Sequence, residues 1–188
     1  MRDVLEKAIT ETAAVMRGVK PDQLGLPTPC RDWDVQTLAN HLLQVATALS
    51  LAGRGEPVPG ELWGRELMAD GWADRFESLA APAVPAEWAG MARVGEAEMP
   101  ASVVAAMLVS DAVLHGWDLA RATGQEYRCD PEVAELTYRF VLETGEQGRQ
   151  MGIFAAPVPV ARDAALLDRA LGLSGRDPRW ARPLSPRG

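Results

Sequence analysis

One long apolar segment, residues 101–123, constrains the fold of this chain more than any other feature. Pro100 suits the first turn of a helix and Gly124 suits its end, so the segment is predicted to form a single helix. A helix that is apolar on most sides is buried, either in a protein core or in a membrane. Because Asp111 and His115 interrupt the apolar run, we expect a core helix and not a membrane span.

The rest of the chain repeats this pattern, with helical spacing of apolar residues between loops rich in proline and glycine. The predicted helices cover residues 2–18, 35–53, 61–79, 101–123, 130–148 and 163–171, the second of them capped by Asp32 or Asp34. A short extended piece is expected near residues 91–94, and a frayed tail after Gly175. With no repeat and no strand-rich region, the pattern predicts an all-α, up-down helical bundle with extra short helices and a Pro-rich carboxy-terminal tail.

Length and charge limit the organisation and the partners of the chain. Its 188 residues fit one domain, predicted to span residues 1–175 with a tail at 176–188. The formal net charge of −7 argues against a nucleic-acid partner, which requires clustered cations. Charged residues stand where an export signal needs an apolar run, and Cys30 and Cys129 lie far apart, so a reduced cytoplasmic protein is expected. The roles of the two cysteines stay open.

The chain has two histidines, and each lies in a predicted helix beside other polar residues. Asp111 precedes His115 by four residues, so on a helix the two side chains share one face. His41 lies on the second predicted helix. One carboxylate and two imidazoles can supply three ligands to a divalent metal and leave a fourth position for water or a thiol. Zinc is the default metal for such ligands, with nickel, iron and cobalt as alternatives.

Each of these residues also has a purely structural interpretation. A helical histidine such as His41 is commonly satisfied by a neighbouring backbone or carboxylate group. A buried carboxylate is costly unless it is paired or bound to a metal, and an Asp111–His115 pair meets that condition without any metal. The metal content of the protein distinguishes the two interpretations.

Several further residues are candidates for a supporting role around such a site. Asp118 lies one turn beyond His115 and can orient its imidazole, or can make an ordinary helix-packing hydrogen bond. A site that uses an anionic thiol also needs a pocket with an apolar wall and a positive charge. The candidates for that pocket, which otherwise belong to the core or to solvated surface, are Trp33, Trp117, Arg31 and Arg121.

Four stretches of the sequence match a known family pattern. They are Pro27–Asp34 leading to Asn40-His41, Asp111–Gly124, Phe154–Val160 and Gly172–Pro178. The most specific is the His-Gly-Trp-Asp-Leu-Ala-Arg segment that begins at His115. With these stretches the chain resembles the DinB/YfiT-like helical metal-binding superfamily, and in particular its actinobacterial branch related to mycothiol-dependent maleylpyruvate isomerase.

The resemblance implies a DinB-like four-helix bundle that holds a metal. One histidine comes from the second helix, and an acidic residue and another histidine come from the fourth. Carried over residue by residue, these ligands are His41, Asp111 and His115. Two departures stand out, because the isomerase has Glu where this chain has Asp111, and it has a second, carboxy-terminal domain for which 188 residues leave no room.

Three functions are compatible with the sequence. The first is a metal-dependent enzyme that uses a small cytoplasmic thiol, mycothiol by resemblance, in thiol transfer to an electrophilic substrate or in isomerisation. The second is a metal-containing protein that binds a small molecule or a thiol conjugate without turnover. The third is a helical bundle in which the Asp–His pair is structural. In the first two cases the expected partners are small molecules, with no nucleic acid or membrane, and the protein is a monomer or homodimer.

Overall fold

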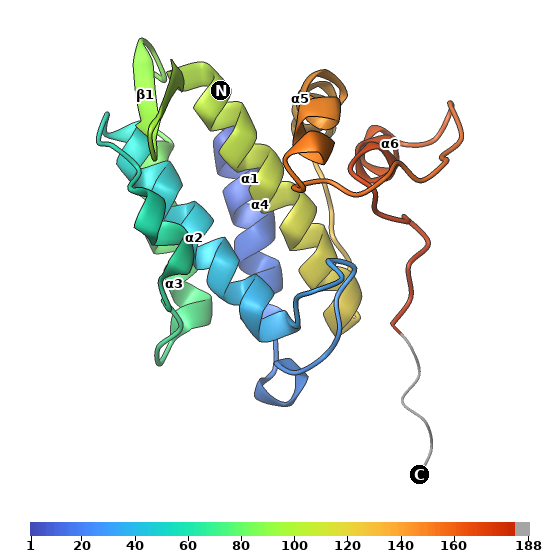
Figure 1. Cartoon of the computed structure of the whole chain (residues 1–188). Helices are drawn as coiled ribbons and strands as arrows, with labels where there is room; N and C mark the ends of the chain where they lie inside the picture. Colours follow the sequence, from blue (N-terminus) through green and yellow to red (C-terminus); the bar gives the residue numbers. More distant parts are fainter. Residues whose placement is uncertain (183–188) are drawn as a thin grey trace.

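The computed structural model describes residues 1–182 and shows an all-α protein with one small hairpin (Figure 1). The helices are α1 (Arg2–Gly18), α2 (Val35–Gly53), α3 (Trp72–Ala80), α4 (Ala101–Thr123), α5 (Pro131–Gln150) and α6 (Leu166–Leu173). The strands β1 (Met91–Val94) and β2 (Ala97–Pro100) pair antiparallel, with Met91 opposite Pro100. The all-α, DinB-like fold and the extended piece at residues 91–94 are therefore confirmed.

Four helices enclose the main core. α1 packs against α3 and α4, and α2 packs against the same two helices, so the order around the bundle is α1–α3–α2–α4 (Figure 1). α4 passes the length and composition test for a membrane span, yet 78% of its most apolar window is buried inside the protein. Every residue from Ala112 to Ala120 is buried, so α4 has the environment of a core helix.

Close contact between α1 and α4 fixes the position of the fourth helix. A Cβ placed on Gly116 would lie 2.8 Å from the Tyr127 ring and 2.9 Å from Thr12 Oγ1. Thr12 is fully buried, and its hydroxyl lies 3.1 Å from the Tyr127 hydroxyl. The glycine next to His115 therefore allows the two helices to approach closely, and a larger residue there would displace α4.

α5 and α6 form an outer layer on one side of the bundle (Figure 1). α5 packs on α4 and α1, and α6 packs on α5. A second apolar cluster joins the three helices through Leu114, Trp117, Val141 and Leu171. This layer brings the chain that follows α6 back to the carboxy-terminal half of α4.

The prediction of a third helix over residues 61–79 is wrong in its first half. The structure has a 3-10 turn at Gly60–Gly64, then an irregular segment, and α3 begins only at Trp72. Gly71 precedes α3 with a left-handed φ of 72°, a conformation that does not continue a helix. Asn40 on α2 binds the backbone of the irregular segment, donating to Arg65 O and accepting from Leu67 N. Tertiary contacts therefore replace the helical hydrogen bonds here.

The frayed tail predicted after Gly175 does not describe the residues that follow it. Arg176 is largely buried against α4, and Arg121 on α4 donates from Nε to the carbonyl oxygen of Trp180 at 3.0 Å. The predicted domain boundary at residue 175 stays a prediction, and the last part of the predicted tail, residues 183–188, lies outside the described residues.

Candidate metal centre

His41 lies on α2 and is held by a neutral amide. Its Nδ1 atom lies 3.3 Å from Gln44 Oε1. The Gln44 Nε2 atom donates to Arg65 O at 2.7 Å and to Trp63 O at 3.4 Å. Because these two carbonyls commit the amide nitrogen, the amide oxygen faces His41, and the histidine must donate from Nδ1. In the neutral ring, the Nε2 atom of His41 therefore carries the lone pair.

His115 lies on α4 and is held by a carboxylate. Its Nδ1 atom lies 3.0 Å from Oδ2 of Asp118, whose side chain is fully buried. An ionised carboxylate accepts hydrogen bonds and cannot donate them, so His115 also donates from Nδ1. The sequence hypothesis that Asp118 orients this imidazole agrees with the geometry. In the neutral ring, the Nε2 atom of His115 again carries the lone pair.

Both Nε2 atoms face Asp111, which lies one turn before His115 on α4. The Asp111 carboxylate has Oδ2 3.1 Å from His41 Nε2 and Oδ1 3.3 Å from His115 Nε2. One ligand atom from each residue lies within 4.8 Å of the other two. The imidazole centroids are 5.0 Å apart, well inside the roughly 10 Å beyond which one ion could not bridge them. The predicted convergence of the three side chains is confirmed.

The cluster shifts the pKa values of its own members. Burial raises the pKa of Asp111, but the two imidazoles outweigh burial and bring it below its usual range. Burial likewise opposes ionisation of Asp118, and the Arg176 guanidinium beside it reverses the effect, so its pKa is also lowered. Burial lowers the pKa of His115, while its hydrogen bonds to the two carboxylates raise it and prevail. Both carboxylates are therefore anionic at neutral pH, which favours a cation between the imidazoles.

Arg176 is a residue of this candidate centre that the sequence hypothesis missed. Its guanidinium binds both carboxylate oxygens of Asp118, at 2.8 to 3.0 Å. The Gly-Arg-Asp-Pro sequence around it belongs to one of the stretches that carry the family resemblance. That stretch was a signal for Arg176, but the hypothesis placed the residue in a tail and gave it no role.

Aromatic rings surround the imidazoles. The Trp33 ring centroid lies 4.8 Å from that of His41 and 5.3 Å from that of His115. Trp63, which the sequence hypothesis did not include, lies 5.8 Å from His41. Trp63 lies in the 3-10 turn at Gly60–Gly64, and Gln44 binds its backbone carbonyl, so the same amide that orients His41 also places an indole beside it.

The other sequence candidates lie away from these contacts. Trp117 is buried in the apolar cluster with α5 and α6, and Arg121 lies over its ring at 5.9 Å. Arg121 donates to the carbonyl oxygen of Trp180 and so binds the segment after α6. Among the described residues, it makes no contact of this kind with the candidate metal ligands. Arg31 is exposed in the loop before α2. The structure thus brings Trp33 and Asp118 to the imidazoles, and it places Trp117 and Arg121 elsewhere.

Neither cysteine has the environment of an activated thiol. Burial, reinforced by Asp118, raises the pKa of Cys30 to about 11. Burial together with Asp130 raises the pKa of Cys129 to about 12. Both are without a disulfide partner among the described residues. Protonated thiols are weak nucleophiles, so the chain itself supplies no thiolate to the centre.

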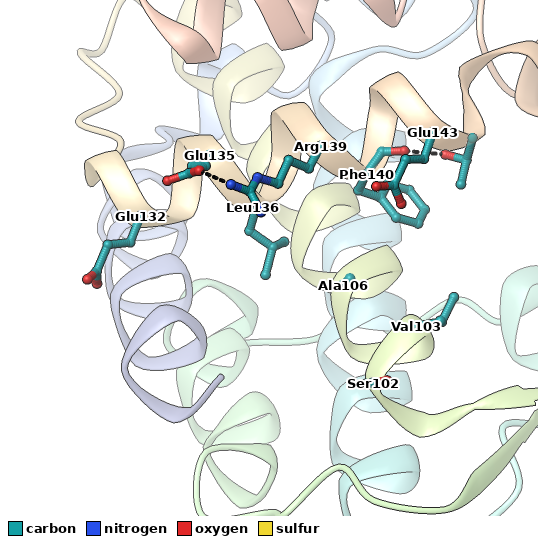
Figure 2. A pocket seen from close by; sticks show the side chains of 10 residues that line it. Ser102, Val103, Ala106, Glu132, Glu135, Leu136, Arg139, Phe140 and Glu143 are labelled. Carbon is teal, nitrogen blue, oxygen red and sulfur yellow. Dashed lines mark hydrogen bonds and ion pairs between the residues drawn. The ribbon is translucent and has the colours of Figure 1, made fainter.

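A groove of about 550 Å³ lies on another face, between the amino-terminal half of α4 and α5 (Figure 2). Its carboxylates are largely satisfied, since Glu135 pairs with Arg139 at 2.5 Å and Glu132 with Lys7 at 2.7 Å. No residue of the metal centre lines it. It is therefore not the predicted pocket lined by Trp33 or Trp117, and that pocket stays a prediction.

Comparison with known proteins gives a family and two relatives. The family model described as the mycothiol maleylpyruvate isomerase N-terminal domain matches residues 5–120. Two relatives, the uncharacterized proteins MT0763 and Rv0738 of Mycobacterium tuberculosis, are each 32% identical over 181 residues, which covers 93% of this chain and 96% of theirs. No solved structure matches the chain significantly. The family match includes His41, Asp111, His115 and Asp118, whereas Arg176 lies beyond its end.

Proposed function

The chain belongs to the family of mycothiol maleylpyruvate isomerase N-terminal domains, and from this premise we propose that it is a metal-dependent enzyme that uses a small thiol. The thiol is mycothiol by family resemblance, and its reaction with an electrophilic substrate is thiol transfer or isomerisation. His41, Asp111 and His115 hold a divalent metal, with zinc as the first choice and nickel, iron or cobalt as alternatives.

One observation carries the metal proposal: both imidazoles point Nε2 at the same carboxylate while a separate acceptor binds each Nδ1. A lone pair 3.1 Å from a carboxylate oxygen is repulsive unless a proton or a metal ion lies beside it. Gln44 and Asp118 fix both Nδ1 atoms as donors, so the protons of the neutral imidazoles are already used. Two imidazoles and one carboxylate are also the ligand set of several catalytic zinc sites, which keep one position open.

A metal in this position lowers the pKa of a coordinated thiol and polarises an electrophile beside it. The protein's own residues keep the ligands in place. Gln44 and Asp118 orient the imidazoles through their Nδ1 atoms, and the Trp33 ring lies beside both imidazole rings. The Asp111 side chain is 31% exposed, so this edge of the cluster is accessible from solvent.

The first test is elemental analysis of protein purified without a chelating tag. We expect about one divalent metal per chain, and loss of that metal when His41 is replaced by alanine. Protein that takes up no zinc, nickel, cobalt or ferrous iron, even when these are added back, would establish the Asp–His pair as structural.

The second test concerns turnover. Metal-loaded protein is incubated with mycothiol and a panel of electrophiles that includes conjugated diacids and epoxides, and conjugate or isomer is measured by chromatography. We expect acceleration over the His41→Ala protein. Thiol binding without acceleration would instead identify a non-catalytic protein that holds a thiol or its conjugate.

We further propose that the protein acts in the cytoplasm on small molecules alone, as a monomer or homodimer. The net charge of −7 and the lack of a disulfide among the described residues are consistent with this setting. Cell fractionation and light scattering of the purified protein test the compartment and the oligomeric state.

A further inference from the structure

We propose that Arg176 is a positioning residue of the metal centre, which acts through Asp118 to hold His115 in its ligand orientation. The proposal rests on the proposed function and adds to it a residue outside the region that the family model matches, which ends at residue 120. It makes the segment after α6 a part of the centre and not a tail.

The contacts form one chain from Arg176 to the candidate metal ligand. The guanidinium donates from Nε to Asp118 Oδ1 at 2.9 Å and from Nη2 to Asp118 Oδ2 at 2.8 Å. Asp118 Oδ2 accepts in turn from His115 Nδ1 at 3.0 Å. The Arg176 and Asp118 side chains are 10% and 0% exposed, so the pair is desolvated. A two-pronged guanidinium–carboxylate contact fixes the plane of the carboxylate as well as its position.

The backbone conformation after α6 places Arg176 next to Asp118. Gly175 has a φ of 87°, and α6 ends with Gly175 N bound to Gly172 O and Arg176 N bound to Leu171 O. These two bonds and the left-handed glycine form a Schellman motif, which places Arg176 directly after the turn. A Cβ on Gly175 would lie only 2.6 Å from Ala155 Cβ, so the turn also packs closely.

The guanidinium is also anchored on its third nitrogen. Arg176 Nη1 donates to Ser174 Oγ at 3.1 Å, and Ser174 is itself 2% exposed. With all three nitrogens bound, the fork has a single orientation, and Asp118 cannot rotate without breaking two charged hydrogen bonds. Because Asp118 Oδ2 is the acceptor for His115 Nδ1, fixing the carboxylate fixes the direction in which His115 Nε2 points.

The test compares Arg176→Gln, Arg176→Lys and a matched control, Arg179→Gln, in the full chain. Arg179 lies three residues further on, is 86% exposed and pairs only with Asp177 among the described residues. The zinc dissociation constant is measured by competition with a chromogenic chelator, at a temperature where each variant is fully folded. The visible spectrum of the cobalt-loaded proteins reports the ligand geometry.

We expect Arg176→Gln to weaken zinc binding by about 10- to 100-fold and to change the cobalt spectrum. Arg176→Lys keeps the charge but not the fork, so an intermediate loss is expected, and Arg179→Gln should equal the wild type. If Arg176→Gln does not fold, Arg176→Lys decides alone. Zinc affinity and cobalt spectrum unchanged in a folded Arg176 variant would overturn the proposal, whereas a wild-type protein that binds no metal would overturn the proposed function and this inference with it.

Discussion

The two imidazoles of the candidate metal centre are held in the same tautomer by side chains of different kinds, one neutral and one charged. His41 donates to Gln44, a neutral amide one turn further along α2, which is tied to the backbone at residues 63 and 65. His115 donates to Asp118, a buried anion one turn further along α4. The charge of Asp118 is balanced by Arg176, which lies 58 residues away in the sequence.

The difference shows what a charged support requires of the fold. A buried amide needs hydrogen bonds only, and neighbouring carbonyls can supply them. A buried carboxylate also needs a countercharge, because an isolated ion in the protein interior is far more costly than an unpaired amide. The support of His41 is therefore complete within α2 and the following loop, whereas that of His115 is complete only after α6 and its carboxy-terminal turn have folded onto α4.

Replacing either imidazole should have the largest effect and tests whether the two supports serve one site. We expect His115→Ala and His41→Ala each to reduce bound metal from about one per chain to none. Both proteins should still melt cooperatively, since the bundle is stabilised mainly by its apolar helix faces. Bound metal is measured by elemental analysis and unfolding by circular dichroism. Retention of metal by one of the two variants would mean that only the other imidazole is a ligand.

Asp118→Asn should have the next largest effect, because it removes the charged support and leaves the Arg176 guanidinium buried without a countercharge. We expect a loss of about 3–5 kcal/mol in the free energy of unfolding, measured in urea. Asp177→Asn is the control, because that aspartate forms an exposed pair with Arg179 and should cost less than about 1 kcal/mol. If Asp118→Asn and Asp177→Asn had equal free energies of unfolding, the buried charge of Asp118 beside His115 would not need a countercharge.

Gln44→Leu should have a smaller effect, because it removes a neutral support. We expect a cost of about 1–3 kcal/mol in unfolding free energy for the hydrogen bonds lost, and zinc binding weaker by about 10-fold. Asn40→Leu is the matched control, since the Asn40 side chain binds the same segment at Arg65 and Leu67 and makes no hydrogen bond to the His41 ring among the described residues. If Asn40→Leu weakened zinc binding as much as Gln44→Leu, the segment and not the amide–imidazole bond would be responsible.

The smallest expected effect is a pH dependence of the free energy of unfolding, which arises from the charged contact between His115 and Asp118. Burial opposes the charged form of His115, but Asp111 and Asp118 prevail and raise its pKa. In metal-free protein, protonated His115 therefore contributes stability that is full below its unfolded pKa of about 6.5 and is lost as the pH rises through its folded pKa. Urea unfolding across this range should show a weaker dependence in Asp118→Asn than in the wild type, and an unchanged one in Gln44→Leu. Equal slopes in the two variants would contradict this assignment.

Much of the fold and the three candidate ligands could be predicted because the signals are local. The segment 101–123 is apolar over many turns and is bounded by Pro100 and Gly124, so its length and burial follow from the sequence. Asp111 and His115 are four residues apart, and any helix brings them to one face. His41 joined them as the other histidine in the chain, on a helix that the Asp34 side chain caps.

The contacts that the sequence did not reveal join segments distant along the chain. The irregular segment after Gly64 resembles a helix by spacing alone, and it departs from one because Asn40 and Gln44 bind its backbone. Arg176 follows a glycine near the carboxy-terminus, where composition indicates a tail. Neither the irregular segment nor the position of Arg176 is indicated by the spacing of apolar residues, because each depends on contacts with side chains of another element.

The sequence by itself determined the helical class, the core position of α4 and the three residues that could bind a metal. Helical periodicity and the free-energy cost of burying a charge can both be judged from a single segment of the sequence. Only the tertiary structure decided which nitrogen of each imidazole is available and what compensates Asp118. Those properties depend on hydrogen-bond partners brought in from the loop after α2 and from the turn after α6, and the positions of such partners are set by packing.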